Sequence, residues 1–115
     1  MRIFRNKVAV LLIALFALVA GPFLGTAVAG GKIALVTDLG GRGDLSFNDM
    51  GFKGADEAAA KFGLELVTIQ SNSGTDYLPN LQNAARTGDF DLIVGVGFLL
   101  ADAMAEVCDQ FPDQN

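Results

Sequence analysis

After residue 30 the chain alternates short apolar runs with helix patterns, and this alternation limits the folds open to it. The apolar runs have the length of strands and lie at 32–37, 64–70 and 91–96. Each is followed by a short loop and a helix pattern, at 46–62, 77–87 and 99–110. Strands that are apolar on both faces and alternate with amphipathic helices indicate a parallel sheet covered on each side. We therefore expect an α/β fold, truncated after about three strand–helix units.

The predicted helices have recognisable start and stop signals. Ser46, with Asp49 three residues later, matches the capping-box pattern at the start of the first helix. Asp76 precedes the second helix and can cap it. Gly63 and Gly88 follow the first and second helices, where glycine commonly ends a helix.

Residues 1–29 have the three parts of a secretory signal. Basic residues come first, an apolar run follows at 8–20, and small residues end at Ala27-Val28-Ala29. This order predicts export and cleavage after Ala29. A membrane anchor is the alternative, because the segment 8–25 is long enough for a short span. Glycine and proline interrupt its far end, and no polar stop-transfer cluster follows.

The single cysteine of the chain, Cys108, lies far from this leader. Lipid-anchored binding proteins carry a cysteine directly after the apolar region, and none is present there. We therefore expect the mature protein to be soluble, in the periplasm or secreted. Cys108 has no partner for an internal disulfide and is expected to be a buried helix residue acting as a small hydrophobe.

The charge balance excludes several classes of partner. The formal net charge is −5, and it becomes −8 when the leader, with three basic and no acidic residues, is removed. Nucleic acids and anionic membrane surfaces are bound through basic patches, so neither is expected as a partner. Residues 30–115 are enough for one modest core.

The loop between the first strand and the first helix is the most informative stretch for function. In an open α/β sheet, ligands bind beyond the carboxyl ends of the strands. Gly41 and Gly43 invite comparison with a dinucleotide-binding fingerprint, but Ser46 stands at the third glycine position. Asp44 would lie at the helix N-terminus, where it would repel a pyrophosphate. The loop suits a neutral polar ligand with a flat face better than a phosphate.

The acidic residues of this loop could serve catalysis, binding or structure. Asp38 and Asp44 both lie near the expected crevice, but acid–base catalysis also needs a perturbed pKa and a partner within reach. The chain has no histidine, and its cysteine falls within a helix pattern. We expect these carboxylates to accept hydrogen bonds from a ligand, or to hold the loop through turn hydrogen bonds. No spacing typical of metal ligands is present, and no cofactor is expected.

Two further positions, Phe47 and Gly97, have open interpretations. Phe47 at the helix start faces either the core or the crevice, where its ring beside the amide of Asn48 would suit a purine base. Gly97 and Phe98 close the third strand at the same edge of the sheet. Glycine there lets backbone amides approach a ligand, or simply permits a tight turn.

Five motifs in order now support a resemblance that covers residues 32–111. They are Thr37-Asp38-Leu39-Gly40, Asp44-Leu45-Ser46-Phe47-Asn48, Gly51-Phe52-Lys53-Gly54, Asp76-Tyr77-Leu78-Pro79-Asn80-Leu81 and 91–98. With these segments the chain resembles the basic membrane protein family, the purine nucleoside receptor type of ABC-transporter substrate-binding proteins.

The resemblance implies a type I periplasmic-binding-protein fold, in which two α/β lobes joined by a hinge close over a nucleoside. It implies that Phe47 stacks on the base while Asn48 and Asp38 contact it. Further candidates for ligand binding are Asp44, Ser46, Gly97 and Phe98. On this basis residues 30–115 are the N-terminal part of the first lobe, and the second lobe is absent.

We therefore expect an exported, non-enzymatic solute receptor. It would bind a purine nucleoside and deliver it to an ABC permease in the inner membrane, and the full-length protein would be a monomer. Closure of two lobes needs contacts from both, so this chain alone is expected to have negligible affinity. The alternatives are an extracytoplasmic sensor domain of a signalling system and a Rossmann-like enzyme.

Overall fold

The computed structural model describes residues 30–115, and the predicted leader at 1–29 lies outside the described residues. Strands and helices alternate along this part of the chain. In order they are β1 (Lys32–Thr37), α2 (Phe47–Phe62), β2 (Glu65–Gln70), the 3-10 turn η1 (Gly74–Asp76), α3 (Tyr77–Thr87), β3 (Leu92–Val96), the 3-10 turn η2 (Phe98–Leu100) and α4 (Ala101–Gln110). Within residues 30–115, no helix is long and apolar enough to cross a membrane.

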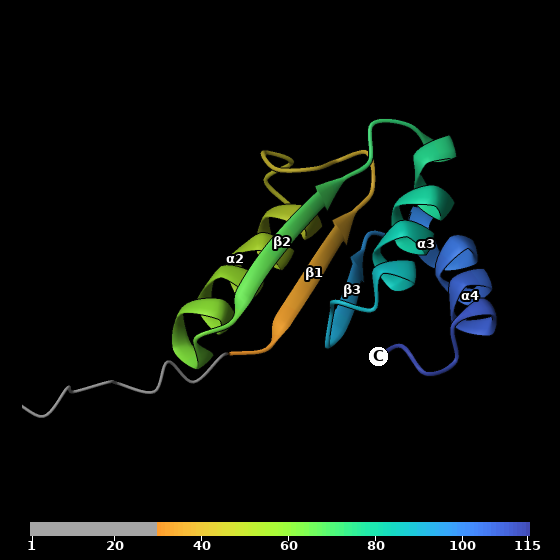
Figure 1. Cartoon of the computed structure of the whole chain (residues 1–115). Helices are drawn as coiled ribbons and strands as arrows, with labels where there is room; N and C mark the ends of the chain where they lie inside the picture. Colours follow the sequence, from red (N-terminus) through yellow and green to blue (C-terminus); the bar gives the residue numbers. More distant parts are fainter. Residues whose placement is uncertain (1–29) are drawn as a thin grey trace, which may run out of the picture.

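The strands form one parallel sheet in the order β2-β1-β3 (Figure 1). β1 pairs with β2 from Lys32 opposite Glu65, and with β3 from Ile33 opposite Leu92. The central position of β1 explains why its side chains from Ala34 onward are buried. The α/β prediction with a parallel sheet is confirmed.

Helices cover both faces of the sheet, as the apolar strands predicted. Val36 of β1 packs in a core cluster with Tyr77 and Leu81 of α3 and with Leu100. α2 lies on the other face, where Gly51 packs on the side chain of Val96. Figure 1 shows α3 and α4 together on one side of the sheet and α2 on the other.

The core lies between the sheet and the pair of helices α3 and α4. Leu81 is 0% exposed and Leu100 is 2% exposed. Burying a leucine side chain contributes about 1.5–3 kcal/mol. Apolar burial at these positions therefore fixes α3 and α4 on β1 and β3.

The predicted element boundaries agree with the structure to within a few residues. Gly63 and Gly88 are in the left-handed conformation at the ends of α2 and α3, so both predicted stops are confirmed. β2 and β3 each begin one residue later than predicted. The third predicted helix starts as η2 and becomes α-helical only at Ala101.

The predicted caps are wrong. Ser46 is at the N-cap position of α2, but its side chain makes no capping hydrogen bond. Asp76 makes no side-chain cap to α3 either. Its carboxylate instead accepts the backbone N–H groups of Asn72 and Ser73, at 2.9 Å each, and so caps the preceding turn η1.

The expected burial of the cysteine is also wrong. Cys108 is exposed on α4, while its neighbour Val107 is the residue of that turn that enters the core. Adjacent positions on a helix point about 100° apart, so only one of the two can face α3 and the sheet. The helix pattern in the sequence did not show whether Val107 or Cys108 faces the core.

Candidate functional site

The carboxyl ends of β1 and β3 lie side by side, and this places two predicted site residues next to each other. Thr37 pairs with Val96 at the end of the ladder. The backbone N–H of Asp38 donates to the carbonyl oxygen of Val96 at 3.1 Å, which extends the pairing by one step. Asp38 and Gly97 therefore leave the sheet at the same edge.

The start of α2 is fixed to the preceding loop by the carboxylate of Asp44. Its Oδ1 accepts the backbone N–H groups of Ser46 (2.9 Å) and Asp49 (3.0 Å), and its Oδ2 accepts that of Asn48 (3.0 Å). These N–H groups lie at the start of the helix, where backbone N–H groups have no carbonyl partner within the helix. Asp44, two residues before the predicted cap, thus caps α2.

These contacts change the acidity of Asp44. Partial desolvation raises the pKa of its carboxyl, but the hydrogen bonds from the backbone of Asp49, Ser46 and Asn48 favour the ionised form and lower the pKa below its ordinary value of 3.8. Both oxygens of Asp44 are occupied by backbone donors. A ligand contact by Asp44 stays a prediction, and its structural role is to cap the helix.

The glycine loop is held by a second carboxylate. Asp49 accepts the backbone N–H of Gly43 at 2.7 Å and that of Leu45 at 3.0 Å. Leu45 has φ = 53°, which is unfavourable for a residue with a Cβ, and is 92% exposed. The two bonds of Asp49 hold this strained turn in place, so the loop keeps one shape beside the site.

Asp38 and Asn48 meet across the base of the site. The side-chain nitrogen of Asn48 donates to Oδ1 of Asp38 at 2.8 Å, and the backbone N–H of Gly40 donates to the same oxygen at 3.1 Å. Asn48 is only 3% exposed, whereas Asp38 is half-buried. The acid and the amide predicted to share one site are therefore directly bonded.

The two aromatic residues of the site face solvent and contact each other. The ring centroids of Phe47 and Phe98 are 5.4 Å apart, with an interplanar angle of 75°. Phe47 is 65% exposed and Phe98 is 81% exposed. Of the two interpretations of Phe47, the core position is wrong, because most of this side chain at the start of α2 is exposed.

All seven predicted site residues lie around the carboxyl edge of β1 and β3, but they do not have one role. Asp38, Asn48 and Gly97 are in contact at the base, and Phe47 and Phe98 form an aromatic wall. Asp44 caps the helix, and within residues 30–115 the hydroxyl of Ser46 makes no capping hydrogen bond. Whether these residues contact a ligand stays a prediction.

Two residues that shape the site, Gly40 and Asp49, were not predicted as site residues from the sequence. Gly40 packs against the side-chain nitrogen of Asn48, where a Cβ would overlap it. Asp49 was assigned to a capping box with Ser46, although its carboxylate reaches back to the loop. Asp44 and Asp49 lie on either side of the start of α2. This spacing could have indicated that both carboxylates bind backbone N–H groups there.

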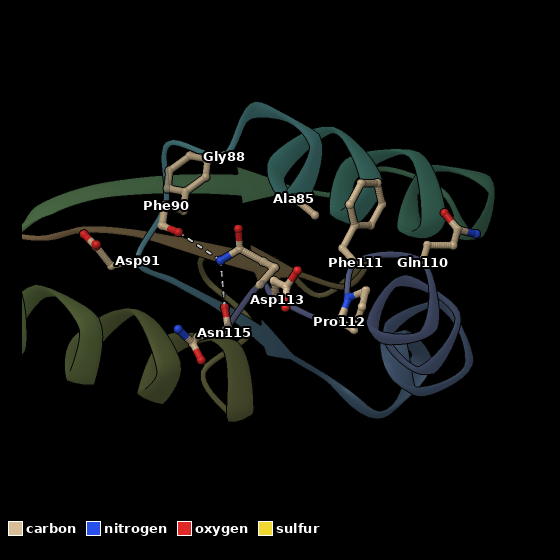
Figure 2. Close-up of a pocket in the computed structure, with 10 residues that line it drawn as sticks. Ala85, Gly88, Phe90, Asp91, Gln110, Phe111, Pro112, Asp113 and Asn115 are labelled. Carbon is tan, nitrogen blue, oxygen red and sulfur yellow. Dashed lines mark hydrogen bonds between the residues drawn. The ribbon is translucent and has the colours of Figure 1, made fainter.

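A separate hollow of about 570 Å³ lies at the opposite end of β3 (Figure 2). The side-chain nitrogen of Gln114 crosses it, donating to the carbonyl oxygens of Phe90 (2.9 Å) and Asn115 (3.0 Å). Its lining residues are Ala85, Gly88, Phe90, Asp91, Gln110, Phe111, Pro112, Asp113, Gln114 and Asn115. None of the predicted site residues is among them, and in α/β sheets ligands bind at the carboxyl ends of strands. The candidate site is therefore the edge that carries Asp38.

The site offers a carboxylate, backbone groups next to glycine and exposed rings. Among residues 30–115, no three histidine, cysteine, aspartate or glutamate side chains are grouped so that they could hold a metal ion. A parallel α/β unit with such an edge has the features of a solute-binding lobe.

Comparison with known proteins identifies the family. Residues 32–115 match the family model Bmp, described as ABC transporter substrate-binding protein PnrA-like. The chain belongs to this family, and the resemblance stated from the sequence is confirmed.

Three similar proteins illustrate the relationship. A protein of Pyrococcus furiosus named as an uncharacterized lipoprotein is 43% identical over 98 residues, which is 84% of this chain and 25% of the relative. The ABC transporter nucleoside-binding protein BmpA of Lactococcus lactis is 36% identical over 88 residues, 73% of this chain and 25% of the relative. The crystal structure of an ABC transporter solute-binding protein from Aeropyrum pernix superposes with a TM-score of 0.69 at 42% identity, covering 73% of this chain and 23% of that one. The chain thus spans about a quarter of the length of these relatives.

Proposed function

We propose that this chain is part of an exported receptor that binds a purine nucleoside for an ABC importer. The receptor does not transform its ligand. In this proposal residues 30–115 supply one wall of the binding cleft, and a second lobe supplies the other. The ligand is then passed to a permease in the membrane.

The exposed ring of Phe47 beside the Asp38–Asn48 pair is the observation that carries the proposal. Phenylalanine is usually buried, and a ring that is 65% exposed next to a structured polar pair needs a reason. Stacking of a flat base on an aromatic face is worth about 1–3 kcal/mol per base. The carboxylate of Asp38 can accept a hydrogen bond from an N–H or O–H group of the same ligand.

The charge of the site supports an uncharged ligand. Asp38, Asp44 and Asp49 are gathered at the edge, and Arg42 is turned away from them. Its guanidinium stacks on the ring of Phe52, 3.9 Å from the centroid, and lies 3.6 Å from a carboxylate oxygen of Asp56. A phosphate would meet carboxylates here rather than a positive group, so a nucleoside fits better than a nucleotide.

The binding test uses a chimaera, because two lobes are needed for closure. Residues 32–115 replace the segment of Lactococcus lactis BmpA that they match, about a quarter of that protein. We expect calorimetry to show binding of inosine or guanosine, with no binding of the corresponding monophosphates. The chain alone should show negligible heat. A folded chimaera that binds none of these nucleosides would contradict the proposal.

A pair of variants tests the role of the exposed ring. Phe47→Ala should weaken nucleoside binding by about 5- to 150-fold, the equivalent of about 1–3 kcal/mol of stacking. Phe62→Ala is the matched control, since this residue is 63% exposed at the far end of the same helix. Equal effects of the two substitutions would remove Phe47 from the site.

The cellular location is also part of the proposal. The leader pattern at 1–29 predicts export with cleavage after Ala29, and N-terminal sequencing of the exported protein should then begin at Gly30. Relatives that are named lipoproteins make lipid tethering the alternative. Recovery of the intact leader, or of the protein only in the membrane fraction, would contradict release in soluble form.

A further inference from the structure

Asn48 has its hydrogen-bonding groups directed inward, so it is poorly placed to contact a ligand itself. Its side-chain nitrogen donates to Oδ1 of Asp38 at 2.8 Å. Its side-chain oxygen is buried and has no hydrogen-bond partner among the described residues. The whole residue is 3% exposed. Asn48 therefore acts through the two carboxylates beside it: that of Asp38, which it bonds at 2.8 Å, and that of Asp44, whose pKa its side chain helps to lower.

The carboxylate of Asp38 has one occupied and one available oxygen. Oδ1 accepts both the amide of Asn48 and the backbone N–H of Gly40. No described donor bonds Oδ2, and Asp38 is only half-buried. Of the three carboxylates at this edge, those of Asp44 and Asp49 hold backbone N–H groups with both oxygens. Oδ2 of Asp38 is therefore the carboxylate oxygen left free for a ligand.

Gly97 leaves the space that this oxygen occupies. A Cβ built on Gly97 would overlap Oδ2 and Cγ of Asp38 and would lie 2.9 Å from its Cβ. The overlap runs from the carboxylate to the Cβ of Asp38, so rotation of the carboxylate alone would not relieve it and the whole side chain would have to turn away. The backbone of Gly97 is also in the left-handed half of conformational space, with φ = 116°.

We infer that Asn48 and Gly97 are positioning residues, which hold Asp38 in one rotamer with Oδ2 as its single free acceptor. This inference rests on the proposed function and deepens it. The site selects a solute that presents an N–H or O–H donor beside its flat face. Asn48 contributes to affinity by fixing the acceptor and not by touching the solute.

A spectroscopic experiment on the chain tests the positioning without any ligand. Asp38→Ala should move both side-chain NH₂ signals of Asn48 in a nitrogen–proton correlation spectrum and speed their exchange with water by at least about tenfold. Asp38→Asn keeps an acceptor oxygen in the same place and should preserve slow exchange. Unchanged Asn48 signals in Asp38→Ala would overturn the inference.

A matched glycine pair separates overlap with Asp38 from backbone strain. Gly97→Ala should shift the Asn48 signals in the same direction as Asp38→Ala. Gly43→Ala is the control, because Gly43 has a similar φ of 97° but open space around its would-be Cβ. An equal response of the Asn48 signals to both substitutions would overturn the role of Gly97.

The ligand arm uses the chimaera with inosine and 1-methylinosine as probes. Methylation removes a ring N–H, so 1-methylinosine should bind at least about tenfold more weakly. Asp38→Ala and Asn48→Ala should each abolish this discrimination, and the double variant should bind inosine no more weakly than Asp38→Ala. Additive losses would show that Asn48 contacts the solute directly and would overturn the inference.

The two proposals fail in different ways. If the chimaera binds neither probe, the proposed function is lost, while the Asn48 signals still decide whether Asp38 is positioned. If the nucleosides bind but Asp38→Ala leaves the Asn48 signals unchanged, the receptor function stands and the positioning role falls.

Discussion

Gly51 of α2 packs directly on Val96 of β3, and a Cβ at Gly51 would lie 2.9 Å from Cγ2 and 3.0 Å from Cγ1 of that valine. Val96 is the last residue of β3, next to Gly97 at the site edge. The contact therefore sets the distance between the first turns of α2 and the carboxyl ends of the strands. Phe47 and Asn48 lie in these turns, so the contact also sets their positions.

Gly51→Ala should destabilise the protein, because the added methyl pushes α2 away from β3. We expect a loss of about 1–3 kcal/mol in the free energy of unfolding, measured by chemical denaturation. Gly54→Ala, one turn later in the same helix with nothing within 4 Å of its would-be Cβ, is the control. It should instead stabilise by up to about 1 kcal/mol, since alanine is the better helix former. Stabilisation by both substitutions would show that the Gly51 contact is not tight.

Leu81→Ala should cost about 2–5 kcal/mol, because Leu81 is 0% exposed in the core between α3 and the sheet. Leu99→Ala, at a leucine that is 59% exposed, should change stability by less than about 0.5 kcal/mol. Denaturant midpoints of the two variants provide the comparison. Similar losses of stability in the two variants would show that Leu81 is not in the core.

The stability of the protein should fall in acid as Asp44 and Asp76 take up protons. Both carboxyls have a pKa below the ordinary 3.8: desolvation of Asp44 is outweighed by its backbone hydrogen bonds, and the backbone of Asn72 and the hydroxyl of Ser73 stabilise the charge of Asp76. A carboxyl whose pKa is lower in the folded state stabilises it above the unfolded pKa. That contribution is lost as the pH falls through the lower, folded value.

Thermal unfolding followed from about pH 6 to about pH 2 checks this dependence. Asp44→Asn and Asp76→Asn should melt at lower temperature than the unmodified protein at neutral pH, and the difference should shrink below pH 3.8. Melting curves that stay parallel across the whole range would contradict the assignment of these two residues as caps.

Leu45→Asn should stabilise the glycine loop by up to about 1 kcal/mol, because asparagine tolerates the left-handed conformation that Leu45 adopts at φ = 53°. Leu39→Asn is the control, since Leu39 is exposed in the same loop without a positive φ. Chemical denaturation of both variants measures the difference. A loss of stability in Leu45→Asn would mean that the leucine side chain makes a contact worth more than its strain.

The fold was largely predictable because its signals are local. Apolar runs at 32–37 and 91–96 have strand length and lie between helix patterns, and Gly63 and Gly88 end their helices as expected. The caps were not predictable in the same way. Asp44 and Ser46 are both good capping residues, and the choice between them depends on the path that the glycine loop takes to α2.

The sequence alone determined the class of fold and the family to which the chain belongs, and it predicted the edge of the sheet at which the candidate site lies. Only the tertiary structure decided the roles within the site. It turned Phe47 outward against Phe98, bonded the amide of Asn48 to Asp38 and assigned Asp44 to the helix start. The physical reason is that each role depends on contacts between residues from different elements. Side-chain type limits which bonds a residue can form, whereas packing across β1, β3 and α2 selects the bond that forms.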